Sequence, residues 1–422
     1  MEKVAFLFTG QGAQFVGMAK NFYDEHIIAR QTFEEANDVL GFDLAQLCFE
    51  GTLSTLTKTE NAQVAILTAS VVAYRVYMEH IGFAPQFCAG HSLGEYSALT
   101  CVGALKFSDA LRIVRKRGEL VQEVVDKDIG GMTIIDGITQ EVVEEECGKA
   151  LSNERFVWIN CYNSPMQFAI SGNKETVETV ESALLDRGAN VTPLFGSAPY
   201  HSPLIAYAVP ELRAAFDSCR LYSFKWPIIA NVTGRPYKDS GMVPDVMARH
   251  MTQPVKWIDT MQCLKRFGVT VAIEMGPKNV LTNLVKANTP EIEAYCYGQK
   301  EDRRNLVELL GSSDTPRKDS ATVVTRCLAA AAATPNKNFN NDEYVAGVVE
   351  NYRKIQSIQD ELDATKSRPS KDQMNKALDI LMEIFRTKQV DAAEQEDWIH
   401  QIIDETGNFY ELSERQTSLV NL

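Results

Sequence analysis

The chain has 422 residues, of which 45% are hydrophobic and 23% charged, and its formal net charge is −14. This composition describes a globular protein with room for two or three domains, and the acidic balance argues against nucleic acid as the main partner. The sequence lacks a run of about 18 apolar residues, so no membrane span is expected.

The apolar stretch at residues 4–8 is too short for a signal peptide. The nine cysteines lack CxxC spacing and several lie in apolar segments, which is typical of reduced, buried thiols. We therefore expect a cytoplasmic protein. Six dispersed histidines form no metal-binding pattern, so no metal is expected.

The first predicted element is a buried strand at residues 4–8, followed by the glycine-rich loop 9–14. The loop lacks the third glycine and downstream acid of a dinucleotide fingerprint, and the Gly-Lys-Ser/Thr of a phosphate loop. Its glycines favour the presentation of backbone N–H groups. Helical patterns are predicted for residues 64–80 and 109–125.

The run Gly90-His91-Ser92-Leu93-Gly94 is the most informative motif of the chain. A short apolar strand at 86–89 precedes it and a helix is predicted at 93–105, which is the context of a nucleophile elbow. The two glycines permit a sharp turn. Because a serine is inert at its free pKa, the motif requires a base and an oxyanion hole. An ordinary glycine-rich turn is the alternative.

The segment 127–196 has a different pattern of predicted elements. Strands are predicted at 132–135, 158–162 and 167–170, and helices at 140–151 and 174–187. This order predicts a ferredoxin-like subdomain. A helix at 209–219 and strands at 228–231 and 271–274 then continue the larger domain. We predict an α/β fold with a parallel, hydrolase-like sheet in residues 1–126 and 197–300, interrupted by the small subdomain.

Residues 301–422 are predicted to form a linker and a helical extension. The segments 312–316 and 334–338 have linker composition, and helices are predicted at about 344–365, 371–388 and 394–405. In the middle helix, apolar residues recur at helical spacing, namely Met374, Leu378, Ile380, Leu381, Ile384 and Phe385. The extension contains no catalytic constellation.

A base for Ser92 must come from the histidines. His201 is the first candidate because it follows a predicted strand at 191–195 and lies in a proline-bounded turn, although a solvent-exposed loop histidine is the alternative. His250 is a second candidate. His91 is adjacent to the serine and should point away from its hydroxyl.

Arg117 lies in the middle of the apolar face of the 109–125 helix, whereas Arg112, Arg115 and Lys116 lie off it. A buried guanidinium is costly without a partner. The partner is either a carboxylate of the protein, in a structural salt bridge, or a carboxylate of the substrate, bound bidentately.

The assembled motifs resemble those of malonyl-CoA:acyl-carrier-protein transacylases over about residues 1–300. The 301–422 extension resembles the tail of free-standing acyltransferases that serve polyketide synthases lacking their own acyltransferase domain. The motifs, in chain order, are Phe8-Thr9-Gly10-Gln11-Gly12, Gly90 to Ala98, Arg117-Gly118, His201-Ser202, Asn231-Val232 and Glu274-Met275-Gly276-Pro277.

The resemblance implies that Ser92 attacks the malonyl thioester while His201 removes its proton, and that a carrier-protein thiol then opens the acyl-enzyme. The backbone N–H groups of Gln11 and Leu93 would form the oxyanion hole, and Arg117 would bind the free carboxylate of malonate. Coenzyme A thioester and carrier protein are the expected partners, and no further cofactor is expected. The family orients its histidine through a backbone carbonyl.

The sequence departs from the family at three places. His250 replaces a usual glutamine, Tyr200 replaces the phenylalanine of polyketide malonyl enzymes, and Lys278-Asn279 interrupts the usual Pro-Gly-Lys-Val. Tyr200 keeps the bulk that favours malonyl over methylmalonyl, and both Tyr200 and His250 are counted as substrate-binding candidates.

A carrier-directed acyl hydrolase is the main alternative function, and Arg117 argues against it because hydrolases of this fold do not need a carboxylate clamp. An α/β-hydrolase esterase would show an acid before a late histidine. A docking scaffold would not need Ser92, His201 and Arg117 together. Arg112, Arg115 and Lys116 are candidates for a basic carrier-docking patch, or for a plain solvated helix face.

Overall fold

The computed structural model describes residues 2–127, 130–152, 155–194, 197–311, 322–365, 367 and 369–406. Its contacts divide the chain into two compact units. We call Met1–Val76 with Pro85–Leu306 the α/β unit, and Tyr77–Ala84 with Val307–Leu422 the helical unit. In the part of the chain described, no helix combines the length and apolarity that a membrane crossing requires.

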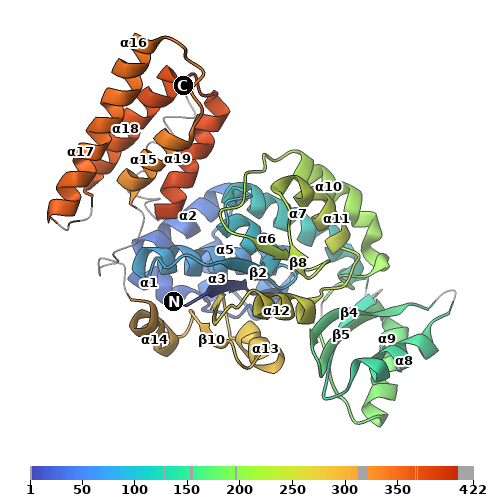
Figure 1. Ribbon diagram of the computed structural model, residues 1–422. Coiled ribbons are helices and arrows are strands. Elements are labelled where there is room, and N and C mark those ends of the chain that lie inside the picture. The colour runs from blue at the N-terminus through green and yellow to red at the C-terminus, as the bar shows by residue number, and fades with distance from the viewer. Residues whose placement is uncertain are drawn as a thin grey trace. The chain divides into compact units, whose positions relative to one another are not determined.

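The α/β unit is built on a six-stranded sheet with the order β10-β9-β1-β2-β7-β8, in which only the edge pair β7–β8 is antiparallel. All five residues of the central strand β1 are buried, as expected for a strand that helices cover on both faces (Figure 1). The predicted α/β class is confirmed. The strands are β1 (Val4–Phe8), β2 (Phe87–Gly90), β7 (Ile228–Ala230), β8 (Arg235–Pro236), β9 (Val271–Met275) and β10 (Glu293–Cys296).

Helices precede and follow these strands along the chain. The helix predicted to run to residue 105 ends earlier, at Cys101, because Gly103 adopts a left-handed φ of 82°. The helices are α1 (Lys20–Glu25), α2 (Ile27–Leu40), α3 (Leu44–Glu50), α4 (Leu53–Thr57), α5 (Thr59–His80), α6 (Gly94–Cys101), α7 (Phe107–Asp126), α10 (Val209–Asp217), α11 (Val243–His250), α12 (Trp257–Arg266), α13 (Val280–Asn288) and α14 (Lys300–Leu310), with 3-10 turns at Pro203–Ala208 and Ser240–Met242.

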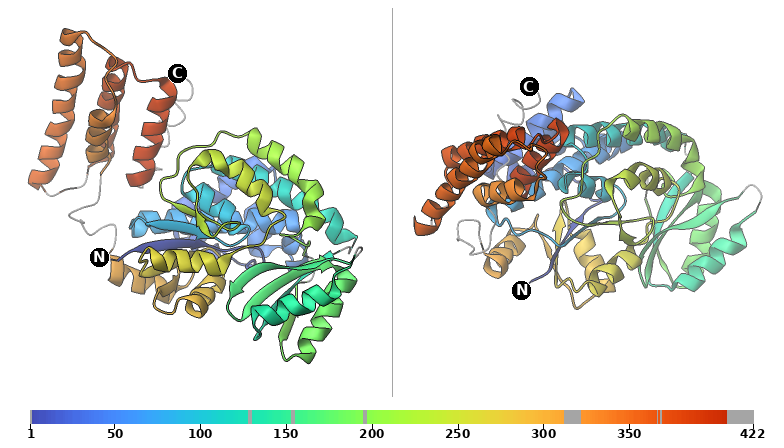
Figure 2. Two further views of the ribbon diagram at one scale, coloured as in Figure 1. Left: turned by 45° about the vertical axis from the view of Figure 1, so that its right-hand side comes forward. Right: turned by 45° about the horizontal axis from the view of Figure 1, so that its top comes forward.

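A second, antiparallel sheet has the strand order β4-β5-β3-β6, and α8 and α9 lie on one of its faces (Figure 2). This is the ferredoxin-like arrangement. Val255 joins the sheet to the rest of the unit, since Tyr162 N–H donates to its carbonyl at 2.9 Å and its own N–H donates to Asn160 O at 2.9 Å. The elements are β3 (Gly130–Asp136), α8 (Gln140–Ala150), β4 (Val157–Ser164), β5 (Gln167–Asn173), α9 (Lys174–Asp186) and β6 (Asn190–Pro193).

The helical unit has its own apolar core. The predicted apolar stripe of α18, from Met374 to Phe385, is buried in it, and α15 is a helix that the sequence analysis did not predict. The predicted linker at 312–316 lies outside the described residues, and 334–338 connects α15 to α16. The elements are α15 (Val323–Ala333), α16 (Asn341–Tyr344), a π-helical turn (Val345–Val349), α17 (Glu350–Thr365), α18 (Lys371–Thr387) and α19 (Ala392–Thr406).

Candidate active site

Ser92 lies in a strained turn between β2 and α6. Its φ of 52° is left-handed, which is the backbone of a nucleophile elbow. A Cβ on Gly90 would overlap the Gly94 carbonyl, and one on Gly94 would overlap the carbonyl of Phe8. The two flanking glycines are therefore required by contact and not only by the turn.

His201 is the base that the structure brings to Ser92. Ser92 Oγ and His201 Nε2 are 2.7 Å apart, and His201 Nδ1 is 2.7 Å from the carbonyl oxygen of His250. Because that carbonyl can only accept, Nδ1 carries the proton and Nε2 offers its lone pair to the serine hydroxyl. The imidazole is thus oriented by backbone and needs no acidic third residue.

The small sheet anchors the turn that carries His201. Asn160 on β4 donates to the Tyr200 carbonyl at 3.0 Å, and Ser171 on β5 donates to the same oxygen at 3.2 Å. Ser202 Oγ donates to Pro199 O at 2.6 Å. His201 itself has a left-handed φ of 58° and is buried. The alternative of a solvent-exposed loop histidine is therefore wrong.

Burial is the main cause of the low basicity of His201. Together with the positive charge of Arg117, it lowers the pKa of His201 to about 3. Burial also lowers the pKa of His91, whose Nε2 lies 2.8 Å from Asn163 Oδ1. His91 therefore has a partner other than the Ser92 hydroxyl, as predicted.

His250 is fully buried and its side chain is not the base. Its Nε2 lies 3.4 Å from Asn231 Oδ1 and 3.6 Å from Glu95 Oε2, whereas its backbone carbonyl holds His201. His250 therefore contributes to the site through its backbone, and its side chain belongs to a buried polar cluster behind the dyad.

The loop that carries Gln11 adjoins the elbow. The parallel register pairs Phe8 with Gly90, so both loops leave the carboxyl edge of the sheet, where open α/β sheets place their sites. A Cβ on Gly10 would overlap the His91 carbonyl. The N–H of Leu93, at the start of α6, and the N–H of Gln11 are thereby in neighbouring loops.

Lys278 provides a tie to the same loop. It has a left-handed φ of 63°, where glycine is favoured, and its Nζ donates to the Gly12 carbonyl at 2.8 Å. This contact gives the Lys278 departure from the family pattern a structural role next to Gln11.

Arg117 is 1% exposed. Among the described residues its hydrogen-bond partner is the neutral side-chain amide of Gln63 and not a carboxylate. Nη1 donates to Gln63 Oε1 at 2.9 Å, whereas Nε and Nη2 are buried without a partner. These two atoms form one edge of the guanidinium, the edge that binds a carboxylate bidentately. The structural salt bridge considered above is therefore not formed with any carboxylate of the described residues.

Tyr200 packs on this arginine. Its ring centre lies 4.3 Å from Arg117 Cζ, within cation–π range, and its hydroxyl accepts a hydrogen bond from Gln63 Nε2 at 2.7 Å. Burial raises the pKa of Tyr200 to about 12. The tyrosine hydroxyl that distinguishes this chain is thus part of the arginine's support.

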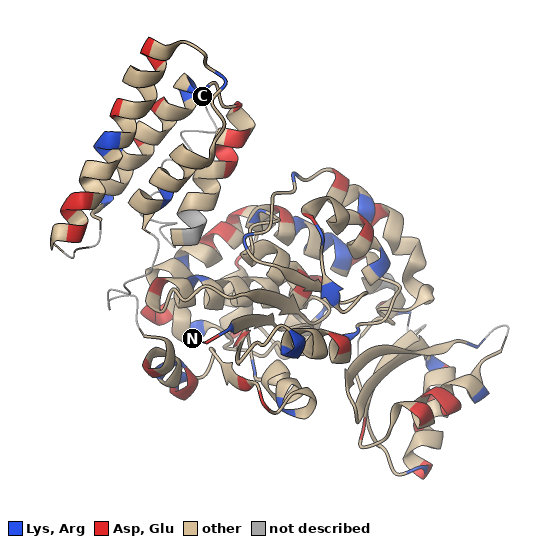
Figure 3. Ribbon diagram, viewed as in Figure 1, with Lys and Arg blue, Asp and Glu red and all other residues tan. Residues whose placement is uncertain are grey.

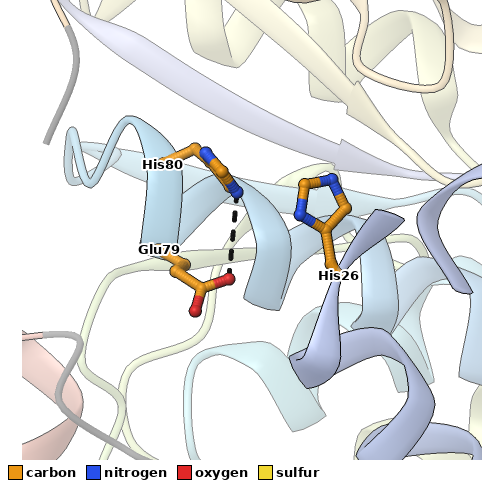
Figure 4. Close-up of side chains that lie close together, drawn as sticks. All are labelled: His26, Glu79 and His80. Carbon is orange, nitrogen blue, oxygen red and sulfur yellow. Dashed lines mark ion pairs between the residues drawn. The ribbon is translucent and has the colours of Figure 1, made fainter. Parts of the chain in front are cut away.

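The side chains that come nearest to a metal-ligating set in the described part of the chain are His26, Glu79 and His80 (Figure 4). His80 Nε2 lies 3.9 Å from Glu79 Oε2, and both side chains are about half exposed. Exposed pairs of this kind are common without a metal, so the expectation of no metal stays a prediction.

The candidate docking residues on α7 are each paired with an acid. Arg112 contacts Asp109 at 3.0 Å, Arg115 contacts Glu119 at 2.8 Å and Lys116 contacts Glu211 on α10 at 2.7 Å. Figure 3 shows basic and acidic residues interspersed over the helices of this unit. The face is therefore charge-balanced and not a strongly basic patch.

The sequence analysis assigned no role to four residues that support the site: Gln63, Glu95, Asn231 and Tyr237. Asn231 accepts the Ser92 N–H at 2.7 Å and donates to Gly90 O at 2.6 Å, which ties both sides of the elbow. The signal that could have found Gln63 is a polar residue inside the apolar run 62–73 of α5.

A serine on a nucleophile elbow, a histidine held by a backbone carbonyl and a parallel sheet define an α/β enzyme with a serine–histidine dyad. The family model described as acyl transferase domain matches residues 5–317. The chain belongs to this acyltransferase family, which includes the malonyl CoA-acyl carrier protein transacylases, and it is an acyltransferase.

A malonyl CoA-acyl carrier protein transacylase of Bacillus subtilis is 37% identical over 395 residues, 94% of this chain and 99% of the relative. Its similarity therefore reaches into the region after residue 317. A second one, of Bacillus subtilis strain 168, is 39% identical over 311 residues, 74% of this chain and 98% of that protein.

Two solved structures have the same fold. The malonyl CoA-acyl carrier protein transacylase from Coxiella burnetii superposes with a TM-score of 0.70 at 32% identity, over 74% of this chain and 98% of its own. A malonyl-transacylase in complex with a type II PKS acyl-carrier protein gives 0.70 at 35% identity, over 73% and 100%.

Proposed function

We propose that this protein transfers a malonyl group from coenzyme A to the phosphopantetheine thiol of an acyl carrier protein through a Ser92 acyl-enzyme, acting in trans for polyketide biosynthesis in the cytoplasm. It would use no cofactor besides the coenzyme A thioester. The names of the relatives support malonyl and carrier protein as substrates, and the complex with a polyketide carrier protein supports the pathway.

Arg117 is the observation that carries the proposal. A fully buried guanidinium with one edge unpaired costs free energy unless a ligand completes it. A planar carboxylate fits that edge with two parallel hydrogen bonds. Since Tyr200 contacts the arginine and precedes His201 in the chain, a malonyl carboxylate bound there would have its thioester end near the dyad.

In the first half-reaction, Ser92 Oγ bonds to the malonyl carbonyl carbon and its proton passes to His201 Nε2. The oxyanion would be stabilised by the N–H groups of Gln11 and Leu93, a contribution of roughly 3–4 kcal/mol per donor in comparable sites. The C–S bond then breaks, and coenzyme A leaves as a thiol with the proton from His201.

In the second half-reaction, the carrier thiol gives its proton to His201 and its sulfur attacks the ester carbon. The C–O bond breaks, and Ser92 recovers the proton from His201. The two halves make a ping-pong scheme in which one base serves in both directions.

Intact-protein mass spectrometry tests the proposal. The enzyme is mixed with malonyl-CoA and then with a carrier protein that bears its phosphopantetheine thiol. A malonyl adduct should form on the wild type and move to the carrier, and it should be absent from Ser92→Ala. Arg117→Ala should be acylated slowly, whereas the control Arg112→Ala, which changes an exposed arginine of the same helix, should behave like the wild type.

The alternative is an acyl hydrolase. An enzyme that remains unlabelled by malonyl-CoA but removes acetyl or longer chains from loaded carrier proteins would overturn the transferase, and Arg117 would then have no substrate carboxylate to bind.

A further inference from the structure

We propose that Glu95, acting through His250 and Asn231, positions the Ser92–His201 dyad, and that deprotonation of this buried cluster sets the lower pH limit of Ser92 acylation. The inference rests on the proposed Ser92 acyl-enzyme. It assigns a positioning role to a carboxylate that does not touch the substrate.

Glu95 is completely buried and has polar contacts on both of its oxygens. Tyr237 OH donates to Oε1 at 2.5 Å, and the backbone N–H of Asn231 donates to Oε2 at 3.0 Å. His250 Nε2 is 3.6 Å from Oε2. No lysine or arginine is paired with Glu95 in the described ranges, so the carboxylate relies on hydrogen bonds alone.

His250 connects this carboxylate to the dyad. Both neighbours of its Nε2 are acceptors, Glu95 Oε2 and Asn231 Oδ1, so the proton lies on Nε2. Its ring meets the His201 ring edge to face, with centroids 4.8 Å apart and planes at 86°. The carboxylate charge is therefore one imidazole away from the base that becomes cationic during acylation.

Asn231 connects the same carboxylate to the nucleophile. Its N–H is bound by Glu95 while its side chain holds the Ser92 N–H and the Gly90 carbonyl. A change at Glu95 is thus passed to both members of the dyad, through His250 to His201 and through Asn231 to the strained elbow.

The cluster of Glu95, Tyr237, Asn231 and His250 can accept a proton at Glu95 while its hydrogen bonds are kept. Burial raises the pKa of Glu95 to about 7, although the hydrogen bonds from Tyr237 and Asn231 oppose this rise. The Tyr237 hydroxyl can rotate and accept from a carboxylic acid where it donated to a carboxylate. Because the groups interact closely, the cluster titrates as a unit.

Arg117 and Arg249 are the permanent cations among the groups around the cluster. Burial is the main cause that holds the pKa of His250 well below its ordinary value, and Arg117 lowers it further, so His250 stays neutral while Glu95 titrates. The ionisable groups around the cluster are Tyr96 on α6, Arg117 on α7, Arg249 on α11, Tyr237, His91 and His201.

Protonation of Glu95 removes the negative charge that favours an imidazolium at His201. His201 itself remains neutral down to a pKa of about 3. Burial also raises the pKa of Glu274 to about 7, but that carboxylate is bound by α13 and does not contact the dyad. We therefore assign a loss of acylation between pH 8 and pH 6 to the Glu95 cluster, and the rate rises as pH rises through its ionisation.

The test is the pH profile of single-turnover acylation by malonyl-CoA, followed by mass spectrometry between pH 5 and 9. Tyr237→Phe removes a hydrogen bond that stabilises the Glu95 carboxylate. The acid limb of the profile, where the acylation rate falls as pH falls, should therefore move to higher pH by about one unit, while the rate at high pH equals that of the wild type. Glu95→Gln should lose the acid limb and acylate at a low rate, about tenfold below the wild-type plateau, at all pH values.

Two controls and one further variant separate positioning from folding. Tyr295→Phe removes an exposed tyrosine–glutamate hydrogen bond, to Glu293 at 2.9 Å, and should leave the profile unchanged. Glu274→Gln alters another buried carboxylate and should also leave it unchanged. His250→Gln keeps a side-chain donor and should shift the limb while the fold is retained.

Two failures are distinguishable. An acid limb that is identical in wild type and folded Tyr237→Phe, with normal adduct formation, overturns this inference and leaves the acyl-enzyme intact. Absence of an adduct on Ser92 at every pH overturns the proposed function as well.

Discussion

The interiors of the two units differ in what they bury. The α/β unit buries several ionisable side chains around the Ser92–His201 dyad. Some of their nitrogen atoms have no hydrogen-bond partner, namely Arg117 Nε and Nη2 and His250 Nδ1. In the described part of the helical unit, Lys388 is the one charged side chain that is buried. Its Nζ donates hydrogen bonds to Ala331 O at 2.6 Å and to Thr334 O at 2.8 Å.

The difference separates two uses of buried polarity. Lys388 is satisfied by carbonyls at the end of α15 and joins α18 to it, which is a structural role. Glu274 is similar, since it accepts from the N–H groups of Leu281 and Thr282 at 2.9 and 2.8 Å. Arg117 is kept incomplete at a cost in stability. An unpaired buried charge, more than burial alone, therefore distinguishes the candidate binding site at Arg117.

Arg117→Met removes the unpaired buried charge and should have the largest effect of the substitutions considered. Malonyl acylation should fall by about 10²–10³-fold because the carboxylate loses its partner. The free energy of unfolding of the α/β unit should stay the same or rise, since an apolar side chain of similar length replaces an unpaired charge. Single-turnover acylation and denaturant unfolding measure the two effects, and a strongly destabilised variant would assign Arg117 to structure.

Leu381→Ala addresses the apolar interior. Leu381 is fully buried in the helical unit, so its truncation should destabilise that unit by about 2–5 kcal/mol. Hydrogen exchange of α15 and α18 peptides gives the measurement. Lys376→Ala, on the exposed face of the same helix, is the control, and equal protection in both variants would contradict the assigned core.

His201→Asn addresses the pH dependence of the α/β unit. The folded pKa of His201, about 3, lies below the ordinary 6.5, so the unfolded state binds more protons between these values and stability falls as pH falls. Asparagine tolerates the left-handed backbone. The variant should lose less stability on acidification, by about 1.4 kcal/mol per pH unit in that window, as measured by urea unfolding at pH 6.5, 5.5 and 4.5. Parallel pH curves for the two proteins would show that His201 is not buried as a neutral group.

Lys388→Met should have the smallest effect, within about 1 kcal/mol at pH 7, because the loss of two hydrogen bonds is offset by relief of a buried charge. Burial lowers the pKa of Lys388, so the wild-type helical unit gains stability as pH rises towards 10.5, and the variant should not. Hydrogen exchange at pH 7 and thermal unfolding at pH 7 and 10 check both points.

Local patterns predicted much of this molecule. The elbow, the ferredoxin-like strand order and the buried stripe of α18 depend on spacing within short segments, and His201 followed from its turn. The support of the site depends on distant pairs that spacing does not show. Gln63 meets Arg117 across 54 positions and Tyr237 meets Glu95 across 142.

The sequence also did not reveal which basic residues of α7 are paired with acidic residues of other helices. Lys116 was a candidate either for a carrier-docking patch or for a solvated helix face, and its partner Glu211 belongs to a helix that begins more than 90 residues later. The early end of α6 needed the left-handed Gly103, which a helical pattern does not reveal.

The state of the cysteines has a consequence for an enzyme that handles thioesters. Eight of the nine are buried and Cys219 is half-buried, and burial raises the pKa of every one of them. Thioesters exchange with thiolates and not with neutral thiols. The protein's own sulfur is therefore a poor competitor for acyl groups, and a thiol-reactive dye added during turnover reports released coenzyme A against a protein background to which Cys219 is the most accessible contributor.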